Sequence, residues 1–285
     1  MRAPKPPLSE LSILASYHYH RKPKFKPVAD AGAMLFADSG AFSAYSSGVP
    51  ISLDEYASWL RRHSHRWHIA ASLDVIHDPI ATWRNTAALR LREIPAHRLL
   101  PTLHLGADAK WLAKYAERGH NYIALGGLQS ATQDEQKTNR RKWIDRCFVV
   151  AEKHGIGLHG FAVTDFRLLT QYPWRSCDSS TFAVVGRFGH LTWYDEHRHR
   201  WFGQRAINPA NLMPHRESIS RFGVNIAQLA KRHGDWHHQG RIVIVQSFLA
   251  LQNWMRKHRR SDFRVFFACG SSEIEKLIDS ANHQR

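Results

Sequence analysis

Short apolar runs alternate with helical stretches along most of this chain, and this rhythm limits the folds that are open to it. Strands separated by helices favour a parallel sheet with helical crossovers. Eight strands are expected, within Leu11–Tyr17, Ala33–Ala37, His68–Leu73, Leu99–Leu105, Asn121–Leu125, Gly157–Val163, Trp174–Phe182 and Arg264–Ala268.

The helices between these runs carry recognisable start signals. Ser52 and Glu55 form a capping-box pattern before a helix over about Leu53–His63, and Asp78 precedes a proline at the first position of the next helix. Further helices are expected at about Ala107–Arg118 and Gln133–His154, in a short stretch before Pro173, near Glu217–His233 and Arg241–Lys257, and from Ser272.

Eight strands with intervening helices predict an α/β protein with a (β/α)8 TIM barrel, a fold of ~250 residues. A doubly wound sheet is the competing architecture, but no expected strand is followed by GxGxxG. We expect one domain over residues 1–285, with additional helices at about 215–285.

Charge and composition indicate the partner and the compartment. Lys and Arg number 40 against 24 Asp and Glu, a formal net charge of +16, which is typical of proteins that bind a polyanion. The sequence contains no run of 18 apolar residues and no signal peptide pattern, so we expect a cytoplasmic protein that binds no membrane. The three scattered cysteines predict neither a disulfide framework nor structural zinc.

Polar residues follow several of the expected strands at the point where each strand ends. These features are Asp38-Ser39-Gly40-Ala41-Phe42, Asp74, Gly126-Gly127 and Asp178-Ser179-Ser180. A barrel builds its active site at the carboxyl ends of its strands, so the three aspartates are candidates for chemistry. Each aspartate alone could instead be a helix N-cap.

These segments, together with Ala124-Leu125-Gly126-Gly127-Leu128 and Pro173-Trp174, resemble motifs of the tRNA-guanine transglycosylase superfamily. They are most similar to its DNA-modifying branch, the deoxypurine-in-DNA protein A group of phages and genomic islands. The resemblance runs over about Leu11–Phe182 and implies a (β/α)8 barrel.

The resemblance also implies base exchange, in which guanine in DNA is replaced by a 7-deazaguanine such as 7-cyano-7-deazaguanine. Asp178 matches the nucleophile that captures the sugar, Asp38 matches the general acid/base, and Asp74 matches the residue that binds the guanine edge. The other expected base-binding residues are Ser39, Gly40, Phe42, His104, Gly126 and Gly127. His104 stands where glutamine is more usual, and His159 is equally compatible with a place in the barrel interior.

Basic residues are candidates for holding the DNA backbone while the target base leaves the helix stack. The candidates are Arg21, Lys22, Lys24, Lys26, Arg256, Lys257, Arg259 and Arg260. The last four residues, Arg256–Arg260 without His258, are as well explained by a solvent-exposed surface that keeps the protein soluble as by binding to phosphates.

The sequence departs from the tRNA-modifying members, because it lacks their cluster of three cysteines and a histidine. No cofactor is therefore expected, and zinc is disfavoured, although His18/His20, His63/His65/His68 and His197/His199 have spacings that can bind a metal. Exchange on tRNA and a non-catalytic basic barrel in a DNA-modification system remain alternatives. Related enzymes often pair, so a homodimer is an expectation too, in the host cytoplasm if the protein is phage-encoded.

Overall fold

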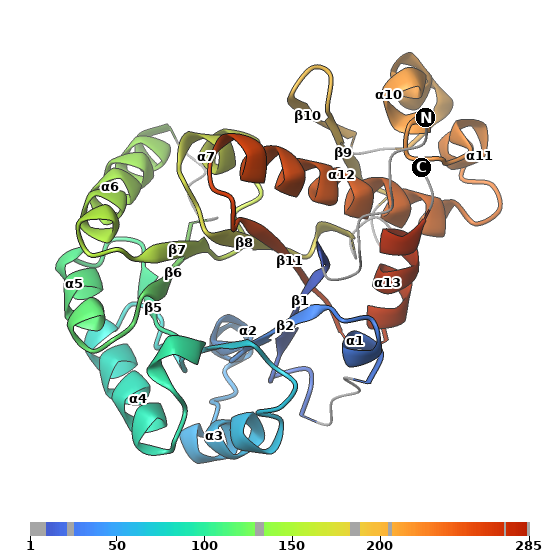
Figure 1. The fold of residues 1–285 in the computed structure, drawn as a ribbon. Coiled ribbons are helices and arrows are strands. Elements are labelled where there is room, and N and C mark those ends of the chain that lie inside the picture. Colours follow the sequence, from blue (N-terminus) through green and yellow to red (C-terminus); the bar gives the residue numbers. More distant parts are fainter. Residues whose placement is uncertain are drawn as a thin grey trace.

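A nearly closed sheet of nine parallel strands forms the centre of the protein, and helices lie around it (Figure 1). The structure is a computed structural model, and it describes residues 10–21, 26–128, 134–182, 189–204, 207–270 and 272–283. The strand order is β4-β3-β2-β1-β11-β8-β7-β6-β5. The predicted α/β class is confirmed, and the sheet is compatible with a TIM-type barrel.

All eight predicted strand regions contain strands of this sheet. The strands are β1 (Ser12–Ser16), β2 (Met34–Asp38), β3 (Ile69–Ala71), β4 (Leu99–Leu100), β5 (Thr102–His104), β6 (Tyr122–Gly126), β7 (Gly157–Gly160), β8 (Ser176–Ser179) and β11 (Arg264–Ala268). The main helices that accompany them are α1 (Lys26–Asp30), α2 (Ala41–Ser47), α3 (Leu53–Arg62), α4 (Pro79–Leu91), α5 (Lys110–Glu117), α6 (Asp134–Lys153), α7 (Phe166–Gln171), α12 (Trp236–His258) and α13 (Ile274–Asn282).

The stretch Leu99–Leu105, predicted as one strand, is divided at Pro101 into β4 and β5. Proline has no N–H to donate to a sheet ladder. Its carbonyl still accepts a hydrogen bond of 2.8 Å from the N–H of Ala124 in β6. β4 pairs with β3 and β5 pairs with β6, so the two outer strands of the sheet are neighbours in sequence.

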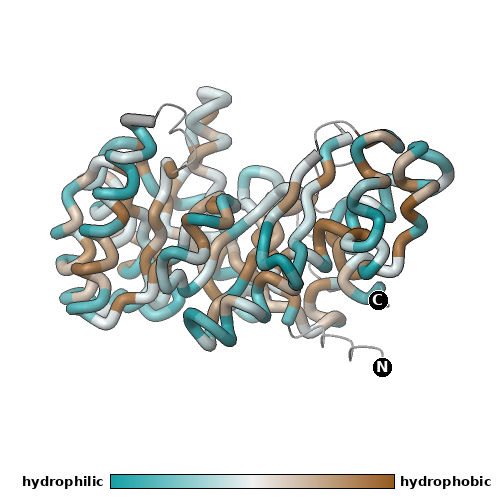
Figure 2. The backbone as a smooth tube through the Cα atoms, turned by 90° about the horizontal axis from the view of Figure 1, so that it is seen from above, coloured by the Kyte–Doolittle hydropathy of each residue, from teal (hydrophilic) through white to brown (hydrophobic). Residues whose placement is uncertain are grey.

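Side chains from the strands fall into two apolar sets, one on each side of the sheet. The smaller set packs together inside the sheet and includes Leu14, Phe36, Ala71, Tyr122 and Phe266. The larger set joins the outer side of the sheet to the helices. Brown, hydrophobic stretches in Figure 2 accordingly lie mainly inside, and teal stretches lie mainly along the outer helices. Parallel strands covered in this way are buried on both faces.

The tail differs from the prediction in two ways. The helix predicted near Glu217–His233 is divided into α10 (Arg216–Ser220) and α11 (Ile226–Ala230), because Gly223 between them has a φ of 72°. An antiparallel hairpin of β9 (Leu191–Asp195) and β10 (Arg200–Gln204) was not predicted, and it lies outside the central sheet in Figure 1. The short elements α9 (Pro209–Leu212), η2 (Ala96–Arg98) and η3 (Met213–His215) complete the described structure.

Among the described helices, none combines the length and the apolar character that a membrane crossing requires.

The start of α3 provides a test of the capping prediction. The side chain of Ser52 accepts a hydrogen bond of 3.3 Å from the N–H of Glu55, which is one half of the predicted capping box, whereas the carboxylate of Glu55 accepts from the hydroxyl of Tyr17 at 3.3 Å. We expect Ser52→Ala to lower the free energy of unfolding by about 1 kcal/mol, because one helix N–H loses its acceptor. Ser52→Asp keeps an acceptor and should be close to wild type in urea unfolding. Equal losses for the two variants would contradict the capping role.

Candidate active site

Three aspartates from three different strands meet at the edge of the sheet where the parallel strands end, called the carboxyl edge below. Asp38 ends β2, Asp74 follows β3, and Asp178 lies within β8. The negative charges of Asp74 and Asp178 both raise the pKa of Asp38. The three side chains therefore belong to one electrostatically coupled group.

Asp38 is the most strongly perturbed member of this group. Burial is the largest cause and the charges of Asp74 and Asp178 are the next, and together they raise the pKa of Asp38 to about 7. The backbone N–H of Gly40 donates to Asp38 Oδ2 at 3.0 Å, and Ser16 on the paired strand β1 also favours the charged form. Near neutral pH the carboxyl group can both give and take a proton, as a general acid/base must.

Gly40 is required by the turn that joins β2 to α2. It is the N-cap of α2 with a φ of 79°, in the left-handed region that favours glycine. A Cβ atom at this position would lie 2.4 Å from Ser16 Oγ and 2.5 Å from His18 Cβ. Gly40 was expected to bind the base; in the structure its N–H donates to Asp38 and it fits against the end of β1.

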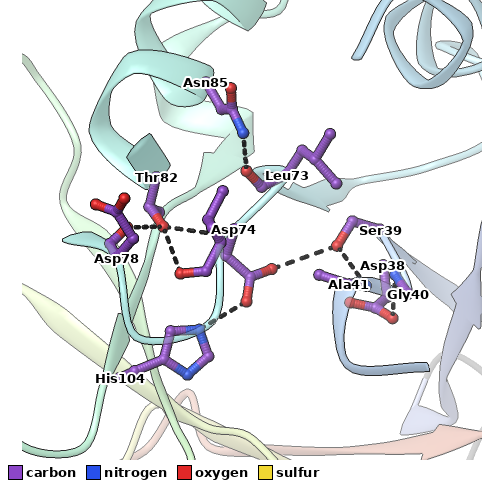
Figure 3. A network of polar contacts seen from close by, with 11 residues as sticks. Asp38, Ser39, Gly40, Ala41, Leu73, Asp74, Asp78, Thr82, Asn85 and His104 are labelled. Atoms are coloured by element: carbon purple, nitrogen blue, oxygen red, sulfur yellow. Dashed lines mark hydrogen bonds and ion pairs between the residues drawn. The ribbon is translucent and has the colours of Figure 1, made fainter. Parts of the chain in front are cut away.

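Both carboxylate oxygens of Asp74 already have partners (Figure 3). The hydroxyl of Ser39 donates to Oδ1 at 3.4 Å, and Nε2 of His104 lies 2.7 Å from Oδ2. Asp74 and His104 are both largely buried. Three residues expected to bind the base are therefore linked to one another, so that a base reaching Asp74 would meet a carboxylate of fixed orientation.

The two glycines after β6 have different roles. In the parallel register His104 pairs with Gly126, and a Cβ at Gly126 would lie 2.9 Å from Nδ1 of His104. The buried backbone of Gly126 thus makes room for the ring that contacts Asp74. Gly127 has a φ of 75° and is exposed, so it forms the turn at the carboxyl edge.

Asp178 accepts hydrogen bonds through one oxygen. The N–H of Ala162 donates to Oδ1 at 2.7 Å, and Nε2 of His159 lies 3.3 Å from the same atom. Ala162 adopts a φ of 54°, which is uncommon for a residue with a side chain, and this conformation aims its N–H at the carboxylate. Among the described residues, no hydrogen bond to Oδ2 of Asp178 is formed.

A buried polar chain continues from Asp178 into the interior of the sheet. Nδ1 of His159 lies 2.5 Å from Oγ of Ser176, which also contacts the hydroxyl of Tyr122. If Tyr122 donates to Ser176, Ser176 donates to His159 and His159 donates to Asp178, each proton has an acceptor. The reverse order would leave the Tyr122 O–H without an acceptor among the described residues. The contacts therefore favour the arrangement in which Nε2–H of His159 points at Asp178.

Phe42, expected to stack on the base, lies on the outward face of α2. Its side chain is 73% exposed, whereas Ala41 and Ala44 on the other side of this helix are buried. The structure therefore does not bring the side chain of Phe42 among the three aspartates.

The four basic residues from 256 to 260 lie at the opposite end of the sheet. They immediately precede β11, at its amino end, whereas the aspartates gather at the carboxyl edge. Arg256 forms an ion pair with Glu10 and donates to the carbonyl of Phe263 at 2.8 Å, and Arg260 donates to Asp262 at 2.6 Å. Lys257 is exposed, and the Arg259 guanidinium lies 5.9 Å from the centre of the Trp254 ring. These contacts join loop and helix, and the placement does not support a shared nucleic-acid track with the aspartates.

Of the basic residues after β1, Arg21 is exposed and its guanidinium lies 5.5 Å from the centre of the Tyr17 ring. Lys22 and Lys24 lie outside the described residues. Lys26 begins α1, but its side chain is likewise outside the description.

Within the described part of the chain, no group of three or more His, Cys, Asp or Glu residues is arranged to hold a metal ion.

Sequence reasoning missed the polar chain behind Asp178. One feature of the sequence pointed to this chain. Side chains along a strand alternate between the two faces of the sheet, so Ser176 and Asp178, two residues apart, lie on the same face. His159 pairs with Ser176 in the register of β7 and β8. That register cannot be read from the sequence of either strand alone.

The raised pKa of Asp38 makes stability depend on pH. The native state keeps this proton up to about pH 7, while the unfolded chain releases it near 3.8, so the free energy of unfolding falls as pH rises between these values. Asp38→Asn removes this contribution. We expect the variant to gain stability relative to wild type, by a few kcal/mol in total, as the pH rises from about 4 to about 7 in urea unfolding.

The exposed Asp279 in α13 provides the matched control. Asp279→Asn should follow the wild-type pH curve throughout. An Asp38→Asn curve parallel to that of the wild type would show that Asp38 carries no such coupling.

Comparison of the chain with protein-family models, with curated proteins and with solved structures found no match.

Proposed function

We propose that this protein is a DNA-guanine transglycosylase built on a (β/α)8 barrel, with β4 and β5 acting as one strand interrupted at Pro101. The observation that carries the proposal is the meeting of Asp38, Asp74 and Asp178 in one coupled group, each with different hydrogen-bond partners. If each aspartate served only as the N-cap of its own helix, the three would not need to share a site. The motif resemblance and the net charge of +16 support the same proposal.

In the proposed reaction Oδ2 of Asp178 attacks C1′ of the target nucleotide. The bond from C1′ to the guanine nitrogen breaks, a covalent sugar–aspartate intermediate forms, and the leaving base takes the proton held by Asp38. The incoming 7-deazaguanine then gives its ring proton to Asp38, and its nitrogen displaces Asp178 from C1′. A pKa of about 7 at Asp38 suits both steps.

Asp74 provides the selectivity in this proposal. A carboxylate accepts hydrogen bonds from both N1–H and the exocyclic amino group of guanine, whereas adenine presents an acceptor at N1. His104 and Ser39 hold the carboxylate in place for this pairing. Because these contacts already restrict the Asp74 side chain, less of its conformational entropy is lost when the base binds.

The decisive test uses radiolabelled guanine placed in duplex DNA, in single-stranded DNA and in tRNA. Wild type should release guanine from DNA when a 7-deazaguanine is supplied. Asp178→Asn should abolish release, because the amide cannot form the intermediate, while DNA affinity changes little. Release from tRNA alone would favour the tRNA alternative, and release from no substrate would favour a non-catalytic nucleic-acid-binding barrel.

Ser176 offers a test of the chain behind the nucleophile. Ser176→Ala removes the donor to His159 Nδ1, so the ring can adopt the tautomer whose Nε2 no longer donates to Asp178. We expect guanine exchange to slow by about tenfold or more, and the acid limb of its pH profile to move to higher pH.

Ser179→Ala is the control on the same strand, since Ser179 contacts Thr181 rather than His159. It should leave the pH profile unchanged. If Ser176→Ala slows exchange without moving the acid limb, the chain is structural and does not act through Asp178.

A further inference from the structure

The loop between β3 and α4 holds one residue in an uncommon backbone conformation. His77 has a φ of 64°, in the left-handed region that favours glycine. It is the third residue of a four-residue turn, which the N–H of Asp78 closes by donating to the carbonyl of Val75 at 3.0 Å. Glycine or asparagine is usual at a turn position with positive φ, so the imidazole ring is carried here at a conformational cost.

Three of the other residues in this conformation are explained by their place in the backbone. Among the described residues, five that are not glycine have a positive φ, and they are His77, Glu93, Ala162, His199 and Arg232. Glu93 and Arg232 follow the ends of α4 and α11, where a left-handed residue is common. His199 lies in the turn between β9 and β10.

The remaining two, Ala162 and His77, both lie at the carboxyl edge, after β7 and after β3. The N–H of Ala162 is directed at Asp178. His77 is three residues from Asp74 in the same way as Ala162 is close to Asp178 in space. Strained residues cluster at functional sites where the surrounding structure holds them in place, so His77 is a candidate for a role beside Asp74.

The neighbouring residues of the loop are fixed on both sides of His77 (Figure 3). The amide of Asn85 donates to the carbonyl of Leu73 at 2.9 Å, and the hydroxyl of Thr82 donates to the carbonyl of Asp78 at 2.9 Å. The carboxylate of Asp78 accepts from the N–H groups in the first turn of α4. The imidazole ring takes part in none of these contacts, so the ring is not what holds the turn together.

The ring of His77 lies beside the pair formed by Asp74 and His104. The centres of the two histidine rings are 6.5 Å apart, and their planes are tilted by 55°. Asp74 and His104 are largely buried, whereas His77 is exposed. Among the described residues, the His77 ring makes no hydrogen bond. Its nitrogens are therefore available to a base that reaches Asp74 from the carboxyl edge.

Recognition of guanine by Asp74 leaves one group of the base without a partner. The carboxylate accepts from N1–H and from the exocyclic amino group, and the adjacent oxygen O6 needs a donor. The hydroxyl of Ser39 and Nε2 of His104 are already engaged with Asp74. Nδ1 of His104 faces Gly126, where a Cβ would lie 2.9 Å from it. A further donor is needed on this side of Asp74, and an imidazole has at least one N–H in every tautomer.

We propose that His77 is a specificity-determining residue whose imidazole N–H donates to O6 of the base, so that Asp74 and His77 together select a 6-oxopurine. The inference rests on the proposed function, because it assigns His77 to the base that is exchanged. It also orients that base. With N1–H at Oδ2 of Asp74, O6 lies on the side of His104 and His77, and the amino group lies on the side of Ser39.

The test measures binding of free bases without turnover, by displacement of radiolabelled guanine in equilibrium dialysis. The probes are guanine, 6-thioguanine and hypoxanthine. 6-Thioguanine keeps N1–H and the amino group but replaces O6 by a weaker acceptor, whereas hypoxanthine keeps O6 and lacks the amino group.

Wild type should bind guanine about tenfold more tightly than 6-thioguanine, since one hydrogen bond is weakened. His77→Gly removes the ring and suits the positive φ. It should bind guanine about tenfold more weakly than wild type and lose most of the preference over 6-thioguanine. Its preference for guanine over hypoxanthine depends on Asp74 and should stay at the wild-type value.

Glu93→Gly is the matched control. Glu93 is also exposed and has a φ of 68°, but it lies before β4, at the opposite end of the sheet from the aspartates. Both glycine variants should unfold at the same urea concentration as wild type or at a higher one, since glycine adopts a positive φ without strain. Only His77→Gly should change the binding of the bases.

Two results would overturn the inference alone. An unchanged preference for guanine over 6-thioguanine in His77→Gly would assign O6 to another donor, and an equal change in Glu93→Gly would attribute the effect to the backbone. Failure of the proposed function gives a different result, because wild type would then bind none of the three bases, and the inference would be overturned with it.

Discussion

Repulsion among three carboxylates gathered at one edge of the sheet is the constraint around which the rest of this site is arranged. Parallel strands deliver Asp38, Asp74 and Asp178 to one edge, and like charges in a poorly hydrated place are unfavourable. Each residue meets this constraint differently. Asp38 retains its proton to about pH 7, Asp74 lies between His104 and Ser39, and the charge of Asp178 is met by N–H groups. The same differences allow three identical side chains to take three separate chemical roles.

The supporting residues explain why small or polar side chains occur inside an otherwise apolar sheet. Gly126 leaves space for His104, and Gly40 leaves space for the end of β1. Ser176 and His159 connect Asp178 to Tyr122 among the aromatic rings of Phe36, Phe161 and Phe266. A buried polar chain of this kind is favourable only when every member is paired, so its geometry is held tightly. Under the proposed function, that rigidity holds Asp178 in one orientation toward the sugar carbon.

Local sequence signals predicted the strands, the helix starts and the aspartates at the strand ends. They worked because period, capping and turn chemistry are properties of neighbouring residues, as at Ser52 and Asp78. The outward position of Phe42 was missed, since it depends on the start of α2, a short helix without a capping side chain. His159 was ambiguous because its role depends on the register of two strands. The remote position of Arg256–Arg260 was in fact readable, since residues before a strand lie at its amino end.

The division of one strand by Pro101 affects how the protein behaves toward its own copies. β4 and β5 terminate the sheet at its two ends, yet only one residue of chain separates them. Edge strands with free N–H and C=O groups are templates on which other chains add and aggregate. Here the two edges adjoin, and proline removes one of the few donors left between them. The interruption at Pro101 makes the sheet less regular, and it therefore also protects the junction between β4 and β5 from strand addition by another molecule.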